Sequence, residues 1–250
     1  MLLSASAVIG YTIEATDGAL GSVDEFLFED RRWIVRWVVV DTGTWLTGRK
    51  VLLPPSQLPR VDEGGRSLRV ALTRQQIEDS PGIERDPPVS RQQEEIIYRY
   101  YGWEPYWGAG FMATAGVGVP PIQPPLYERE LAAEAAHPVG DPHLRGAREV
   151  TGYYIHARDG DIGHVADLLI DPDGWDIRYL VVDTRNWWPG KNVIVSPQWA
   201  ADISWSERTV TLDLTRDQIR SGPEYDPRAP MDRAFEERLH SHYGRRAYWF

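Results

Sequence analysis

The feature that most constrains the fold of this chain is an internal repeat. Residues 10–107 align with residues 152–249 at a constant offset of 142 without a gap, and about a third of the pairs are identical. The identities cluster at turns, at one apolar run and at the copy ends, where Tyr106-Trp107 matches Tyr248-Trp249. A repeat of this length is the signature of a duplicated structural unit. We therefore expect two similar units in one chain.

The stretch between the copies has a different composition. Residues 108–143 contain six Pro and five Gly, a proportion typical of linkers rather than of packed cores. We predict a first repeat over residues 1–107, a Pro/Gly-rich linker over residues 108–143 and a second repeat over residues 144–250.

Within each copy, short β-branched and aromatic runs are bounded by Asp-Gly turns, at Asp17-Gly18 and at Asp159-Gly160. Five or six such strands on about 70 residues favour a small closed barrel, since closure removes exposed sheet edges. A short helix then begins at a capping box, and a longer helix ends at Gly102 or Gly244. We expect this longer helix to pack on a barrel and to be exchanged between the halves.

Composition excludes several classes of protein. The chain has no Cys, which excludes disulfides and thiolate chemistry and fits a reducing compartment. Its formal charge of −10 repels the negatively charged phosphate backbone, so no direct nucleic-acid ligand is expected. No apolar run reaches the length of a membrane span, and the first ten residues lack a basic signal-peptide region. We expect a cytoplasmic protein with no transmembrane segment and no cofactor.

The first copy contains an ordered series: Ile9-Gly10, then Asp17-Gly18-x-Leu20-Gly21, then residues 36–42 with Asp41-Thr42 at their end, then Trp45 and residues 48–52. The second copy repeats this series, which resembles the PRC-barrel domain. That family includes the cytoplasmic barrel of the photosynthetic reaction-centre H subunit and the C-terminal domain of a ribosome-maturation factor. The resemblance implies a mainly β fold with short helices: two tandem small barrels, each followed by C-terminal helices and related by pseudo-two-fold symmetry. It supplies no catalytic residues, because the known members act as assembly or docking modules. The repeated signature consists of Gly10, Asp17, Gly18, Gly21, Asp41, Gly152, Asp159, Gly160, Gly163 and Asp183.

Several titratable residues have both a chemical and a structural interpretation. Glu94-Glu95 and Glu236-Glu237 could be paired acid/base carboxylates, but their place in the first turn of a helix favours a role with the helix dipole. Asp41 and Asp183 end an apolar strand and need partners, either Arg36 and Arg178 or the following turn. We favour the structural interpretation in both cases.

Metal binding has two weak candidates. His240 and His242 are the only close His pair, and the segment 171–176 holds three Asp residues without the full ligand series of a calcium loop. We interpret the former as surface residues and the latter as a turn, and we predict no metal site.

The aromatic content is high, with 11 Trp and 12 Tyr. Such residues either are buried between the two barrels, which we favour, or form a contact surface. Two equivalent loops combine Trp, Gly and a basic residue, and they are the candidates for partner contact: Trp45, Arg49, Trp187, Trp188 and Lys191.

These observations predict a non-catalytic protein-interaction or scaffold module whose protein partner is unidentified; a homodimer remains open. One alternative is an accessory of photosynthetic electron transfer that resembles the H subunit. A second is a small-ligand binder or enzyme that uses a cleft between the barrels. A deep polar cleft with a carboxylate of shifted pKa would favour this last alternative, and a flat aromatic patch would favour the scaffold.

Overall fold

The computed structural model describes residues 2–44, 46, 48–58, 60–81, 89, 91–107, 144–184, 191–229 and 231–249. The predicted linker, residues 108–143, lies outside this described part, so its boundaries stay a prediction.

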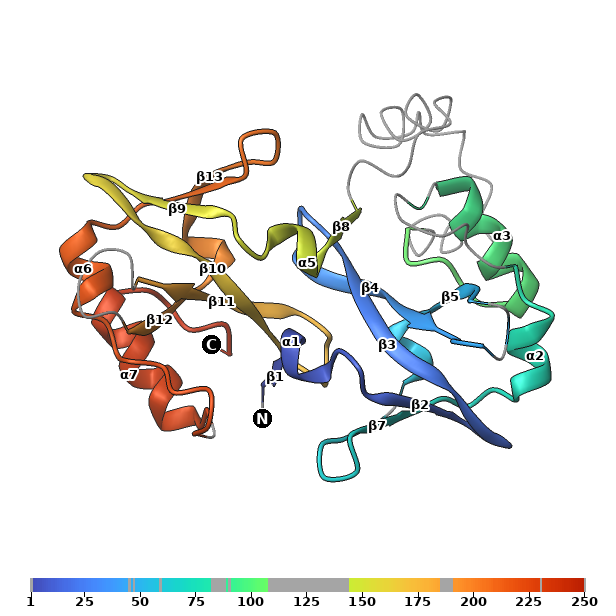
Figure 1. Cartoon of the computed structure of the whole chain (residues 1–250). Helices are drawn as coiled ribbons and strands as arrows, with labels where there is room; N and C mark the ends of the chain where they lie inside the picture. The colour runs from blue at the N-terminus through green and yellow to red at the C-terminus, as the bar shows by residue number, and fades with distance from the viewer. Residues whose placement is uncertain are drawn as a thin grey trace, which may run out of the picture.

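The chain is mainly β, as the turn pattern predicts, and forms two sheets (Figure 1). The first sheet contains β2 (Thr12–Ala15), β3 (Gly18–Glu29), β4 (Ile34–Asp41), β5 (Lys50–Leu53), β6 (Arg60–Asp62), β7 (Ser67–Arg69) and β8 (Leu144–Gly146). The second contains β1 (Leu3–Ser4), β9 (Tyr154–Ala157), β10 (Gly160–Ile170), β11 (Ile177–Asp183), β12 (Asn192–Val195), β13 (Ala200–Ser204) and β14 (Thr209–Leu212).

The helices are short and occupy matching places in the two repeats. They are α1 (Ala5–Val8), α2 (Arg74–Glu78), α3 (Arg91–Tyr101), α5 (Ala147–Val150), α6 (Arg216–Arg220) and α7 (Arg233–Tyr243), with 3-10 turns η1 (Pro55–Gln57) and η3 (Pro197–Trp199). The predicted capping boxes are present: Thr73 pairs with Gln76 at α2, and Thr215 pairs with Gln218 at α6. Gly244 ends α7 in the left-handed conformation that its position predicted.

Both sheets have the same strand order, β5-β4-β3-β2-β7-β6 and β12-β11-β10-β9-β14-β13, which confirms the duplication. The prediction that each sheet closes into a barrel is wrong for the described residues, because the end strands of each path do not pair with each other. In the first sheet these end strands have only four and three residues, and Pro54 and Pro55 between them lack a backbone N–H. The sheets therefore remain strongly curved but open.

The first segment of each repeat pairs with the sheet of the other repeat. Leu3 of β1 lies opposite Ile170 of β10, and Leu144 of β8 lies opposite Glu29 of β3. The exchanged elements therefore differ from those predicted: α3 and α7 lie at opposite ends of the molecule, each on its own sheet, while α1 and α5 lie near the middle (Figure 1).

Side chains fix this exchange in equivalent ways. Asp167 on β10 accepts hydrogen bonds from the Oγ of Ser4 (2.5 Å) and from the backbone N–H of Ser6 (3.0 Å). Its counterpart Glu25 on β3 accepts the backbone N–H of Arg148 (3.2 Å). Each carboxylate thus caps a short helix of the other repeat, where it satisfies free backbone N–H groups.

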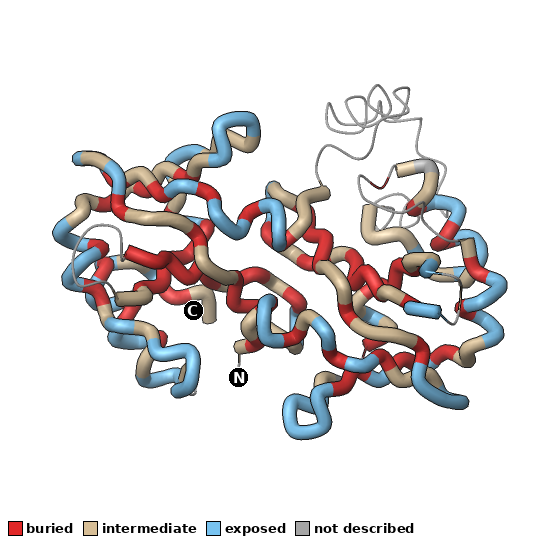
Figure 2. Tube along the Cα trace, in the orientation of Figure 1, coloured by how far each residue is buried: buried red, intermediate tan, exposed pale blue. Residues whose placement is uncertain are grey.

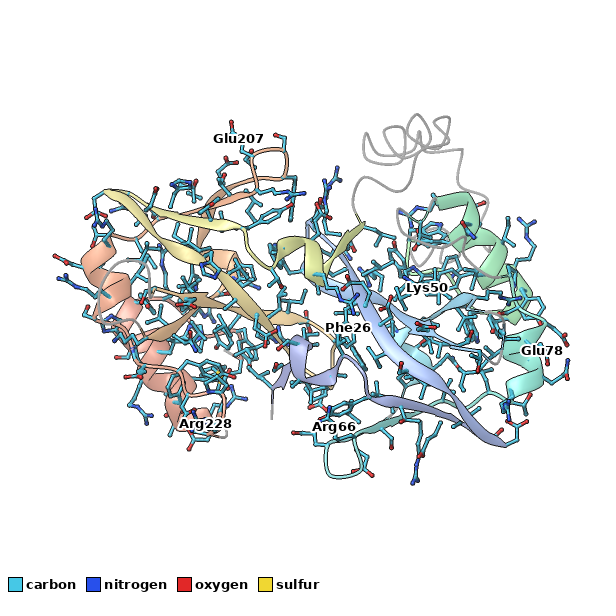
Figure 3. The ribbon with its side chains drawn as sticks, in the orientation of Figure 1. Phe26, Lys50, Arg66, Glu78, Glu207 and Arg228 are labelled. Atoms are coloured by element: carbon cyan, nitrogen blue, oxygen red, sulfur yellow. The ribbon has the colours of Figure 1, made fainter. Side chains whose placement is uncertain are left out.

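The hairpin tips of the two repeats also pair with each other. The backbone N–H of Val35 donates to the carbonyl of Trp175 (2.9 Å), and that of Ile177 donates to Trp33 (2.7 Å). The rings of Phe26 and Trp175 meet across the same junction, with Phe26 near the middle of the molecule (Figure 3). One buried core therefore runs through both sheets (Figure 2), and a second, smaller one lies between α3 and the first sheet around Trp37 and Ile97.

The repeated Gly and Asp signature has a structural explanation. A Cβ on Gly21 would lie 2.1 Å from the carbonyl oxygen of Asp41, and one on Gly163 would lie 2.0 Å from that of Asp183, so only Gly allows this close strand approach. Asp17 accepts the backbone N–H of Arg74 at the start of α2 (2.8 Å). Asp159 does the same for α6.

Candidate functional site

The first repeat contains a buried glutamate, Glu94, at the interface between α3 and the sheet. Glu94 has no exposed surface, and its Oε1 accepts hydrogen bonds from the Nε1–H of Trp37 (2.5 Å) and the hydroxyl of Tyr106 (3.3 Å). Nη1 of Arg91, one turn earlier on α3, lies 3.2 Å from Oε2. The carboxylate therefore ties together the sheet, the helix and the copy end.

The second repeat has the same arrangement around Glu236. Its Oε1 accepts hydrogen bonds from the hydroxyls of Tyr179 (3.0 Å) and Tyr248 (2.9 Å), and Arg233 lies 3.2 Å from Oε2. Tyr179 also bonds Nε2 of the buried His240 (2.9 Å). Glu94 and Glu236 are therefore equivalent centres of one duplicated cluster.

Electrostatics keep this second cluster in one protonation state near neutral pH. Burial and the neighbouring Glu236 carboxylate raise the pKa of Tyr248 to about 12, and the same causes raise the pKa of Tyr179 further. Burial lowers the pKa of His240, so its imidazole is neutral. These groups are held as donors and acceptors rather than poised for proton transfer at neutral pH.

Arginine side chains close the outer face of each cluster against the copy-end aromatic pair. The guanidinium of Arg36 lies 4.1 Å from the centroid of the Tyr106 ring, and Arg91 lies 4.1 Å from that of Trp107. In the second repeat, Arg178 covers Tyr248 at 4.1 Å and Arg233 covers Trp249 at 3.9 Å. The copy-end aromatics are thus partly buried, as favoured from the sequence, but within each repeat rather than between repeats.

A groove of about 830 Å³ lies between the two repeats. One wall comes from β4, η1, Tyr98 of α3 and the residues after α3, including Trp103 and Tyr106. The facing wall is the β10–β11 turn of the second repeat, residues 172–175. The groove therefore needs both repeats, which is the cleft that the second alternative anticipated.

The pseudo-equivalent place in the second repeat is a smaller hollow of about 550 Å³, whose lining includes Asp30, Arg31, Trp33, Pro197 and Ala200. Gln57 lines the groove, and its counterpart Trp199 is buried with its ring 5.3 Å from that of His240 and 5.0 Å from that of Tyr243. The two repeats have therefore diverged in how they line these hollows: Gln57 lines the larger one, whereas Trp199 is buried and does not line the smaller one.

The structure places the predicted contact residues in part. Trp45, Trp187 and Trp188 lie outside the described residues. Nη2 of Arg49 donates to the carbonyls of Ile77 and Ser80, after α2, and Nζ of Lys191 donates to the carbonyl of Gly222 after α6 (2.6 Å). Both basic side chains thus bind the end of a helix in their own repeat.

Arg36 and Arg178, one of the two alternatives considered for Asp41 and Asp183, pair with other carboxylates. Nε of Arg36 lies 3.1 Å from Oε2 of Glu29, and Arg178 pairs with Asp171 and Asp176. Arg36 lies near the hairpin end of β4, whereas Asp41 ends the strand five residues later, roughly 16 Å away along an extended strand. Asp41 instead accepts the backbone N–H of Gly43 (2.8 Å), the turn-capping alternative.

The two weak metal candidates have other contacts. Oδ1 of Asp171 accepts the backbone N–H of Asp173 (3.1 Å), which makes the segment a turn. His240 is buried rather than at the surface, whereas His242 is exposed and lies 2.9 Å from the carbonyl of Gln218. The described residues contain no group of three His, Asp or Glu side chains suited to a metal ion.

Sequence reasoning found Glu94 and Glu236 but assigned them to the helix dipole. The presence of Glu at the same position in both copies was the signal that pointed to these residues. Their partners Trp37 and Tyr179 lie 57 residues earlier, and nothing in the sequence linked them to the glutamates. The groove gave no local signal at all.

Comparison with known proteins agrees with this architecture. The family model of the PRC-barrel domain matches residues 144–219, which run from β8 through β14 into α6. A search of curated protein sequences found no match. None of the helices in the described ranges combines the length and apolar character needed to cross a membrane.

Proposed function

We propose that this chain is a protein-docking module that performs no reaction of its own and holds a segment of a partner in the groove between its repeats. We further infer that the first repeat is a second domain of the PRC-barrel type, since it shares the strand order and the repeated signature of the matched one. The groove is the observation that carries this proposal, because neither repeat alone could form it.

The state of the buried polar groups supports docking over catalysis. A general acid or base must reach its substrate with a pKa near the working pH. Glu94 is enclosed by Trp37, Tyr106 and Arg91, and Tyr248 is held to a pKa of about 12. The groove wall instead presents aromatic rings on a rigid frame, as interaction surfaces do.

A variant that fills the groove tests the proposal. Gln57→Trp introduces the residue that the second repeat already accommodates at Trp199. In cross-linked native extracts, we expect the wild-type chain to capture one defined complex and the Gln57→Trp variant to lose it. Glu207→Gln, on an exposed turn away from the groove, is the matched control and should capture the complex as the wild type does (Figure 3).

Equal capture by the wild type and a folded Gln57→Trp variant would contradict docking in this groove. Catalytic turnover of a small molecule that is lost when Glu94 or Glu236 is substituted would contradict the proposal that the chain performs no reaction.

A further inference from the structure

The rim of the groove carries two carboxylates from different repeats. Glu104 follows α3 of the first repeat, and Asp173 lies in the β10–β11 turn of the second. Both residues are exposed, and within the described ranges neither has an ion-pair partner. Two free negative charges on facing walls favour a positively charged ligand.

The arginine in the groove does not cancel this charge. Arg36 is already paired with Glu29, and its guanidinium lies over the ring of Tyr106. The electrostatic character of the rim is therefore set by Glu104 and Asp173.

The wall of the groove adds an independent feature, Tyr98. Only 7% of this residue is exposed, and its ring packs edge-on against Trp37 and Trp107, with centroids 5.1 and 5.2 Å away. In the part of the chain that the structure describes, the Tyr98 hydroxyl has no hydrogen-bond partner, although the residue lines the groove. The hydroxyl itself is not enclosed and opens on the groove, so it can bond a ligand or water there, and aromatic rings also attract cations.

The acidic rim is specific to this side of the molecule. The repeat offset relates Glu104 to Arg246 and Asp173 to Arg31, so both pseudo-equivalent positions carry the opposite charge. Trp199 in turn replaces the groove residue Gln57. The facing pair of carboxylates is therefore specific to the groove, whereas the smaller pseudo-equivalent hollow is lined by Arg31 and Arg145 beside Asp30 and Asp202.

We propose that the groove binds an extended basic segment of a partner protein, with a Lys or Arg cation between Glu104 and Asp173 and its aliphatic stem against the aromatic wall. This inference rests on the proposed docking function and adds the chemistry of the partner. The overall charge of −10 would also steer a basic segment toward the chain.

Selection from a phage-displayed random dodecapeptide library on the full-length chain tests the proposal. We expect enriched peptides to contain Lys or Arg and to bind in fluorescence anisotropy. Affinity should fall roughly tenfold or more in the double variant Glu104→Gln/Asp173→Gln and when the peptide's basic residue is changed to Gln. Arg31→Gln/Arg246→Gln is the matched control, because it removes two exposed charges at the pseudo-equivalent positions and should leave peptide affinity within about twofold.

Other outcomes separate the two proposals. The enriched peptides could lack basic residues, fail to bind the Gln57→Trp variant and bind the Glu104→Gln/Asp173→Gln variant as they bind the wild type. That result would overturn the basic-segment inference and leave the docking proposal intact. Failure to enrich any peptide blocked by Gln57→Trp would count against docking itself. Sedimentation could also show that the chain self-associates and that both double variants abolish this self-association. That result would overturn the proposal of a foreign partner, because the groove would then bind a second copy of this chain.

Discussion

Trp199 of the second repeat stands where Gln57 stands in the first, and this exchange changes which side chains line the two pseudo-equivalent hollows. The Trp199 ring packs against His240 and Tyr243, whereas Gln57 lines open space beside Tyr98. At this position the first repeat therefore exposes a polar side chain to its hollow, whereas the second repeat buries an aromatic ring beside its own.

We expect the two reciprocal substitutions at these positions to have unequal effects on the free energy of unfolding. Trp199→Gln removes a buried ring and leaves a cavity, so we expect it to lower the free energy of unfolding by about 3 kcal/mol. Gln57→Trp adds a ring to open space and should change it by less than about 1 kcal/mol. Urea denaturation of both variants checks this, and a large loss in Gln57→Trp would mean that the position is already packed.

The buried glutamates should be structural. Glu94→Ala leaves the indole N–H of Trp37 and the guanidinium of Arg91 without their acceptor, and we expect it to cost about 3 kcal/mol. Glu94→Gln retains a carbonyl oxygen for Trp37 and should cost less than half as much. Chemical denaturation measures both, with the exposed neighbour Glu95→Ala as the control.

Glu95→Ala should stay within about 0.5 kcal/mol of wild type. Equal small losses for the Glu94 and Glu95 variants would contradict the role of Glu94 in joining helix and sheet.

The exchange of N-terminal segments predicts a local effect. Asp167→Ala removes the acceptor for Ser4 and Ser6, and we expect a cost of about 1–2 kcal/mol, which is typical of a lost helix cap. Hydrogen exchange should accelerate in residues 3–8, which lie far from Asp167 in sequence. The exposed Asp202→Ala is the control, and unchanged exchange in the segment 3–8 would argue against the pairing of β1 with β10.

The sequence predicts the features of this fold that depend on nearby residues. Asp-Gly turns, capping boxes and the Gly244 helix end are local, and each occurs where its pattern placed it. The partners of Glu94 and the groove depend on residues brought together only by packing. The exchanged segments, such as Leu3–Ser4, are also too short to show a periodicity that would identify the sheet they join.

Closure of the sheets shows the same limit in another way. The argument that a small sheet must remove its edges is sound physically, but it does not specify how. Here the strand at each repeat start crosses to the other sheet, and the hairpin tips pair through Trp33 and Trp175. Contacts between the repeats thus pair part of the strand edges that barrel closure was expected to remove.

His240 predicts a pH dependence that the first repeat, with Tyr98 at the same position, lacks. Burial lowers the pKa of His240 in the folded chain, so the unfolded chain binds the proton more tightly. The stability that the neutral imidazole contributes is therefore present above the unfolded pKa of about 6.5 and is lost as the pH falls through the lower folded value.

We expect His240→Tyr to flatten the slope of stability between about pH 6.5 and pH 5, because it removes this proton-linked loss. The groups that face the imidazole, Glu236, Tyr179 and Tyr248, stay in place in this variant. Urea denaturation at pH 7.5 and pH 5 gives the comparison, with the exposed His242→Tyr as the control. The interpretation fails if His240→Tyr and wild type lose the same free energy of unfolding over that interval.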